Sequence, residues 1–159
     1  MHVIFLIKNF KLSKCGISDY INISSKYFDK QKIKNSIIFS NYLNINKKNF
    51  TYINWNVFKI LKEIKKITGK KIFFFQFSPF LQSKSGFSLE LLIIFFFLRF
   101  FYKETKVVIN FHETANSFNA NPKYLLLYLA HIFQVLLLFL LSNKVYYTNK
   151  IFLNRFRFF

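Results

Sequence analysis

Short apolar runs, each the length of one β-strand, alternate along this chain with longer segments of helical character. The runs lack the polar alternation of a half-exposed strand, which is typical of strands covered on both faces. The strand-like runs are residues 3–7, 36–40, 51–54, 72–77, 107–111 and 144–148. The helical segments are residues 18–30, 57–68, 89–102 and 124–141. This order predicts an α/β fold, a Rossmann-like parallel sheet with helices on both faces, in a single domain over residues 1–159.

Two of the helical segments are apolar enough to raise the question of a membrane. The apolar stretch between Glu90 and Arg99 is much shorter than the roughly 20 residues that a span needs. Residues 124–141 are nearly long enough, but they carry His131 and Gln134 in the middle. Strand-like runs also lie on both sides of this segment, at the spacing of an alternating α/β domain. We therefore predict a buried or interfacial helix over residues 124–141, with a membrane span as the alternative.

The charge of the chain is strongly positive, with 24 Lys and Arg against 6 Asp and Glu and a formal net charge of +18. Nearly all of it is Lys, and Lys, Asn, Ile and Phe share AT-rich codons, so codon bias explains much of the excess. A positive surface still attracts anionic lipid headgroups, so we expect peripheral contact with an anionic membrane. Nucleic acid is not an expected partner, because arginines are few and no nucleic-acid-binding motif is present.

Cysteine usage and the amino-terminal sequence bear on localisation. The single cysteine, Cys15, excludes an internal disulfide and fits a reducing compartment. The first apolar run is too short for a signal peptide, and no small-residue cleavage site follows it. We predict a cytoplasmic protein that acts at the inner face of the plasma membrane if it contacts lipid.

Most of the potentially reactive polar residues lie in three loops that follow strands, where open parallel sheets bind their ligands. In the first loop, Gly16 allows close approach of a ligand to backbone N–H groups at a helix start. A purely structural role fits these residues as well as ligand binding does, because Gly16 would allow a tight turn and Ser18 and Asp19 would cap the helix. The chain has neither the dinucleotide fingerprint nor a P-loop, so a general nucleotide-binding domain is the less favoured alternative.

His112 and Glu113 follow a strand-like run directly and are the candidate catalytic residues. An imidazole at a strand end can orient or stabilise a substrate near neutral pH. Glu113 can serve as a base, as a partner that orients the imidazole, or as a helix cap. A purely structural histidine is the alternative for His112. No cluster of metal ligands is present in the sequence, so no metal site is expected.

Several motifs, in order, resemble the N-terminal half of glycosyltransferase family 4. Cys-Gly-Ile-Ser-Asp-Tyr at residues 15–20 is similar to the opening loop of that family. Further matches are Phe-Gln-Phe-Ser-Pro-Phe at residues 75–80, Val-Val-Ile-Asn-Phe-His-Glu at 107–113 and Lys-Val-Tyr-Tyr-Thr at 144–148. The resemblance covers nearly the whole chain. It implies the N-terminal, acceptor-side lobe of a GT-B fold.

The resemblance also implies a function and a set of site residues. Such enzymes transfer a sugar from a nucleotide sugar to a glycan or lipid-linked acceptor, with retention of configuration. They use no cofactor beyond the donor substrate and usually no metal ion. The first loop, here Cys15, Gly16, Ser18 and Asp19, lies near the donor phosphates or the acceptor. Gln76 is a further candidate for substrate binding, and the strand-end histidine, here His112, lies close to the transferred sugar.

The donor-binding lobe of that family has no counterpart in this sequence. Its two glutamates eight positions apart are missing, since the glutamates here are residues 63, 90, 104 and 113. We therefore expect no sugar transfer by this chain alone. A truncated gene and a split enzyme completed by a separate C-terminal polypeptide are the two explanations. The alternative function is that of a non-catalytic membrane-associated protein with one or two inserted apolar helices.

Overall fold

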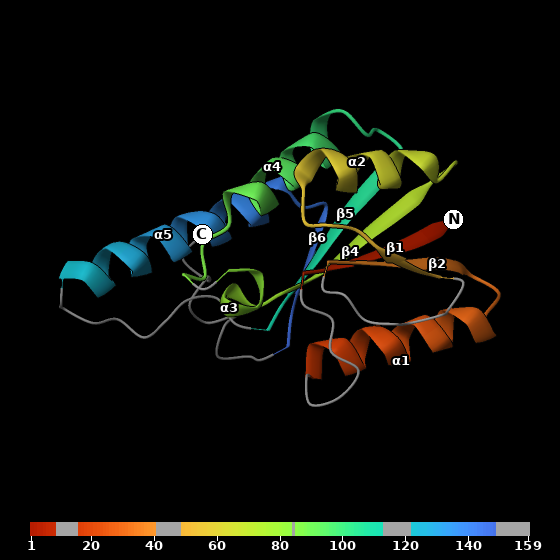
Figure 1. Ribbon diagram of the computed structural model, residues 1–159, viewed down its shortest axis with the longest axis horizontal. Coiled ribbons are helices and arrows are strands. Elements are labelled where there is room, and N and C mark those ends of the chain that lie inside the picture. Colours follow the sequence, from red (N-terminus) through yellow and green to blue (C-terminus); the bar gives the residue numbers. More distant parts are fainter. Residues whose placement is uncertain (9–15, 41–48, 84, 113–121, 149–159) are drawn as a thin grey trace.

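The computed structural model describes residues 1–8, 16–40, 49–83, 85–112 and 122–148. Six parallel strands form one sheet in the order β3-β2-β1-β4-β5-β6 (Figure 1). The strands are β1 (His2–Ile7), β2 (Lys34–Phe39), β3 (Phe50–Tyr52), β4 (Lys71–Phe77), β5 (Thr105–Phe111) and β6 (Lys144–Tyr147). The helices are α1 (Gly16–Lys30), α2 (Val57–Lys66), α3 (Pro79–Gln82), α4 (Leu89–Phe100) and α5 (Pro122–Leu141). The predicted Rossmann-like parallel sheet with helices on both faces is confirmed.

The sequence located the predicted elements well, with ends shifted by one or two residues. Asp19 lies in the first turn of α1, as expected. Ser18 was expected to cap that helix, and this is wrong, because α1 already begins at Gly16 and Ser18 lies inside it. The short helix α3, which begins at Pro79, was not among the predicted helical segments. Proline at a first helical position needs no N–H partner, which explains why a breaker residue starts a helix here.

Alternation along the strands divides the core into two parts. In β1, Val3, Phe5 and Ile7 pack toward α1, whereas Ile4 and Leu6 join the larger cluster. That larger cluster includes buried residues of α2, α4 and α5. Helix α1 therefore covers one face of the sheet, and α2, α4 and α5 lie over the other (Figure 1).

Helix α5, which was predicted to be buried or interfacial, is buried on one face only. Its inward face is buried, but other apolar residues along it are exposed, Leu126 by 72% and Leu140 by 71%. Within the described residues, Tyr124–Leu141 is the one helical stretch whose length and composition would allow it to cross a membrane, and 22% of it is buried. Burial of α5 is therefore limited to one face of the helix.

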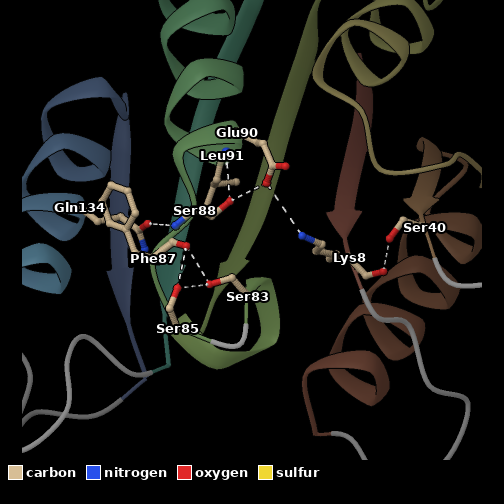
Figure 2. A network of polar contacts seen from close by, with 9 residues as sticks. All are labelled: Lys8, Ser40, Ser83, Ser85, Phe87, Ser88, Glu90, Leu91 and Gln134. Carbon is tan, nitrogen blue, oxygen red and sulfur yellow. Dashed lines mark hydrogen bonds and ion pairs between the residues drawn. The ribbon is translucent and has the colours of Figure 1, made fainter. Parts of the chain in front are cut away.

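Polar side chains on the inward face attach α5 to the segment before α4. His131 Nε2 lies 2.8 Å from the carbonyl oxygen of Ser85, and Gln134 Nε2 donates to the carbonyl oxygen of Gly86 at 3.1 Å. Gln134 Oε1 accepts from the backbone N–H of Ser88 at 2.5 Å (Figure 2). Gln134 and the Nε2 atom of His131 thus have partners inside the domain, as buried polar groups usually do. Nδ1 of His131 is buried without a hydrogen-bond partner among the residues that the structure describes.

Gly86 offers a direct test of this attachment. A Cβ added there would lie 2.7 Å from His131 Cε1 and closer still to Nε2, at a φ of +79°. Gly69 has a φ of +77° with nothing within 4 Å of the added atom. We expect Gly69→Ala to cost about 1 kcal/mol of unfolding free energy from backbone strain alone. Gly86→Ala should cost a further 1–3 kcal/mol or so from overpacking, measured by urea unfolding. Equal losses would contradict the tight contact with His131.

Protonation of His2 should make the free energy of unfolding depend on pH. Its Nε2 lies 2.8 Å from Ser36 Oγ, across the pairing of β1 and β2. Burial lowers the pKa of His2 below its ordinary 6.5, and Lys34, the N-terminal amine and Lys71 lower it further. The folded state favours the neutral imidazole, so the contribution of His2 to stability is complete above pH 6.5 and is lost as the pH falls through the lowered pKa.

Urea unfolding of wild type and His2→Gln from about pH 7.5 to pH 5 should show a steeper loss of unfolding free energy for wild type. Parallel curves would contradict this.

Candidate functional site

The strand order reverses between β1 and β4, since β1 leads outward to β2 and β3 while β4 leads to β5 and β6. In open parallel sheets, ligands bind in the crevice outside the carboxyl ends of the strands at such a point. The order seen here is the one in which dinucleotide-binding folds place that crevice. The topology therefore directs attention to the carboxyl ends of β1, β4 and β5.

A polar cluster lies at the ends of β4 and β5. Gln76 and Asn110 are partners in the strand register, and both are buried, with exposed fractions of 1% and 6%. Asn110 Nδ2 donates to Gln76 Oε1 at 2.9 Å. His112 Nε2 lies 2.5 Å from the same oxygen. The side chains of Asn110 and His112 thus both meet the amide oxygen of Gln76, which the neighbouring strand provides.

This arrangement selects one tautomer of the neutral imidazole. An amide oxygen only accepts hydrogen bonds, so Nε2 of His112 must carry the proton. In the neutral ring, the acceptor lone pair then lies on Nδ1. The backbone N–H of His112 donates to the carbonyl oxygen of Phe77 at 3.0 Å and extends the pairing past the end of β5. The ring is therefore held in one tautomer by a residue that is itself buried.

The other end of the Gln76 amide is unusual. Its Nε2 is buried and has no hydrogen-bond partner within the described part of the chain. Leaving a buried donor unsatisfied costs about 1–3 kcal/mol, and such groups are rare in native proteins. An acceptor oxygen of a ligand would offset that cost. Gln76 is for this reason the residue that most directly indicates binding.

The start of α1 lies beside this cluster. The ring of Tyr20 is 6.2 Å from that of His112, centroid to centroid, with the planes at 75°. Backbone N–H groups in the first turn of a helix favour an anion or a polar oxygen. Gly16 and Asp19 in this turn are exposed, while Ser18 is buried with an exposed fraction of 1%.

Some of the predicted site residues are therefore brought together. Gln76 and His112 are in direct contact, and Tyr20 brings the turn that holds Gly16, Ser18 and Asp19 to the same edge of the sheet. Cys15 and Glu113 lie outside the described residues. The predicted roles of these two residues are neither supported nor contradicted.

Sequence reasoning missed Asn110 and Tyr20. Asn110 had a detectable signal, because Gln76 and Asn110 are each a single polar residue one position before the end of an apolar strand. A polar residue within a strand buried on both faces needs a partner, and two of them in neighbouring strands can be partners of each other. For Tyr20 the signal was its place at the end of the motif at residues 15–20, because by pattern an aromatic residue in an amphipathic helix normally belongs to the core.

On the opposite face of the sheet, a second set of contacts joins β1 to α4. Lys8 Nζ lies 3.9 Å from Glu90 Oε2, and Ser88 Oγ lies 3.4 Å from the same oxygen (Figure 2). Lys8 Nζ also lies over the ring of Trp55, at 5.1 Å from its centroid. Trp55 Nε1 is buried without a partner among the residues the structure describes. A half-exposed ion pair contributes little stability, so these contacts mainly fix the position of Lys8.

Comparison with known proteins gives no further guide to this site. No protein-family model matches the chain, and no curated protein matches it. Among the described residues, no group of His, Cys, Asp and Glu is arranged to hold a metal ion. The chemistry of the site must therefore be argued from the cluster itself.

A double-mutant cycle would measure the contact at its centre. Gln76→Leu and Asn110→Leu, alone and together, should show a coupling of about 1 kcal/mol in unfolding free energy, because each removes the same hydrogen bond. Asn49 belongs to a separate cluster with Ser25, Asp29 and Asn35. Asn49→Leu combined with Gln76→Leu should be additive within about 0.5 kcal/mol. A cycle between Gln76 and Asn110 that is equally additive would remove the basis for the cluster.

Proposed function

We propose that this chain forms the acceptor-side lobe of a glycosyltransferase, which moves a sugar from a nucleotide sugar to a glycan or lipid-linked acceptor. The observation that carries the proposal is the buried donor of Gln76 beside the imidazole of His112, at the carboxyl ends of β4 and β5. A sugar hydroxyl is both a donor and an acceptor. Its oxygen can accept from Gln76 Nε2, the buried donor that has no partner within the described residues.

The proposal gives each residue a separate task. Gln76 binds a hydroxyl and fixes the tautomer of His112, and His112 orients the hydroxyl near the transferred sugar. Asn110 holds the amide of Gln76 in place. Gly16, Ser18 and Asp19 lie where the first turn of α1 could receive phosphate or acceptor oxygens. Cys15 keeps the binding role that the resemblance implies. Glu113 keeps the catalytic role predicted from its place directly after the strand-like run at residues 107–111.

Three features support this function, and the first and the third of them favour it over a general nucleotide-binding one. The motifs at residues 15–20, 75–80 and 107–113 occur in the order found in glycosyltransferase family 4. The sheet has the strand order of a Rossmann-like lobe. The loop after β1 lacks the glycine pattern that binds dinucleotide phosphates. The proposed reaction needs a donor lobe, the nucleotide sugar as substrate, no further cofactor and no metal ion.

A second candidate function is that of a non-catalytic membrane-associated protein. The uncharged stretch Tyr124–Leu141 favours it, since 22% of that stretch is buried. Insertion of α5 across a bilayer would break the contacts of His131 and Gln134 with residues 85–88. Unpaired polar groups of this kind are costly in lipid. We therefore favour the first function.

The test is a binding experiment that follows the side-chain amide signal of Gln76. In the ¹⁵N spectrum of the labelled protein, the side-chain amide of Gln76 should shift when oligosaccharides or detergent-solubilised lipid-linked sugars are titrated in. The amide of Asn49, bonded within its own cluster, should not. Gln76→Leu should weaken binding by about tenfold or more, as loss of a buried hydrogen-bond donor predicts. Gln31→Leu makes the same change on the exposed turn after α1 and should leave affinity unchanged.

Two outcomes would contradict the proposal. Sugars that bind without moving the Gln76 signals would place their site elsewhere. Binding of free nucleotides but of no sugar would favour a general nucleotide-binding domain.

A further inference from the structure

Helix α4 carries an apolar stripe on its outward face. Leu89, Ile93, Phe96 and Phe100 recur at helical spacing, with exposed fractions of 61%, 36%, 46% and 56%. The core side of the same helix is separate and consists of Leu91, Leu92, Ile94, Phe95 and Leu98, all buried. Helix α4 is thus apolar on nearly all sides, although only one side packs in the domain. A helix of this kind normally has its second side covered as well.

Helix α5 carries a second stripe of the same kind. Leu126, Leu129, Phe133 and Leu140 are exposed by 72%, 53%, 56% and 71% and again recur at helical spacing. This stripe lies opposite the side on which His131 and Gln134 contact residues 85–88. The polar contacts therefore fix which face of α5 points away from the domain.

The two stripes meet in one groove. Helices α4 and α5 pack against each other, and Figure 1 shows α5 running beyond the edge of the sheet. The groove between them has a volume of about 610 Å³ and only apolar and aromatic lining residues, among them Phe96 and Phe133. We call the two stripes and this groove the α4–α5 face. Contiguous exposed apolar surface of this kind marks an interaction site.

Charge indicates what covers this face. Glu90 is the one acidic residue of the two helices, and Lys8 pairs with it. Because β5 and β6 are parallel, α4 and α5 end at the same edge of the sheet. That edge carries exposed Arg99, Lys103, Lys106 and Lys144 against one exposed carboxylate, Glu104, so its balance is positive. A second copy of this chain would bring another +18 charge to the face, whereas an anionic lipid surface attracts it.

We propose that the α4–α5 face docks on an anionic lipid bilayer, with both helices lying in the interface rather than crossing it. The aromatic and aliphatic stripes enter the boundary between headgroups and acyl chains, and the basic edge contacts lipid phosphates. His131 and Gln134 keep their partners in residues 85–88, so α5 stays part of the domain. The docking does not depend on sugar transfer and can be tested apart from it.

The test is flotation of the full chain with vesicles. We expect binding to vesicles of phosphatidylcholine and phosphatidylglycerol in equal parts, and much weaker binding to phosphatidylcholine alone. Added salt should weaken the binding, because it screens the basic edge. Phe96→Gln combined with Phe133→Gln should reduce binding about tenfold or more, since both rings leave water on docking.

Phe58→Gln is the matched control. Phe58 lies on α2, outside the α4–α5 face, and is 76% exposed. Its replacement should change binding by less than about twofold. Thermal unfolding of every variant establishes that it folds. Leu126→Gln provides a second variant on the face, expected to weaken binding in the same direction.

Three results would overturn the proposal. The first is equal loss of binding in the face variant and in Phe58→Gln. The second is a dimer in the absence of vesicles that the face variant abolishes, because a second copy would then cover the face. The third is bound protein that resists extraction with alkaline carbonate, because α5 would then span the bilayer. The sugar-binding signals of Gln76 are not involved in any of these measurements, so either proposal can fail alone.

Discussion

The pairing of β4 with β5 is the contact on which both the core and the candidate site depend. The two strands are in register from Lys71 with Thr105 to Phe77 with Phe111. On one face, this pairing places the rings of Phe77 and Phe111 5.3 Å apart, and Phe75 lies 5.5 Å from Phe95 of α4. On the other face it places Gln76 opposite Asn110. A slip of one residue would exchange the two faces and bury the polar pair against α4.

Phenylalanine serves two opposite purposes in this molecule. Phe73, Phe75 and Phe95 form a closely packed set in the core, with edge-to-face contacts of 5.5–5.7 Å between Phe95 and each of the other two. Phe96 and Phe133 belong to the same two helices that contribute to this core but face away from it. Burial of apolar area drives both arrangements. The core phenylalanines are buried by other residues of the domain. The exposed parts of Phe96 and Phe133 would have to be covered by another surface.

The segment between β4 and α4 connects the site with the apolar face. It begins directly after Gln76 and Phe77, includes α3, and ends at Ser88, whose hydroxyl caps α4 by accepting from the N–H of Leu91. Residues 85–88 of the same segment hold α5 through His131 and Gln134. The carboxyl end of β4, the start of α4 and the middle of α5 are thus linked by one short stretch of chain. A ligand bound at Gln76 would lie at the start of this segment, and a membrane bound to α5 would lie near its end.

The sequence by itself determined the class of fold and the order of its elements. Continuous apolar runs require strands with two covered faces, and apolar residues at helical spacing require helices beside them, so local pattern was enough. It also indicated the strand-end position of His112. Helix ends were less well determined, as Ser18 shows, because caps depend on one or two backbone angles.

Only the tertiary structure decided which residues share a site and which face stays exposed. Gln76 and Asn110 are 34 positions apart, and parallel pairing makes them neighbours. The apolar pattern of residues 124–141 was compatible with a buried, an interfacial or a spanning helix. The contacts with residues 85–88 selected one orientation and left Leu126 and Leu140 in solvent. The hydrophobic effect is non-directional. The sequence pattern can therefore show that an apolar residue should be buried, whereas the fold determines which surface buries it.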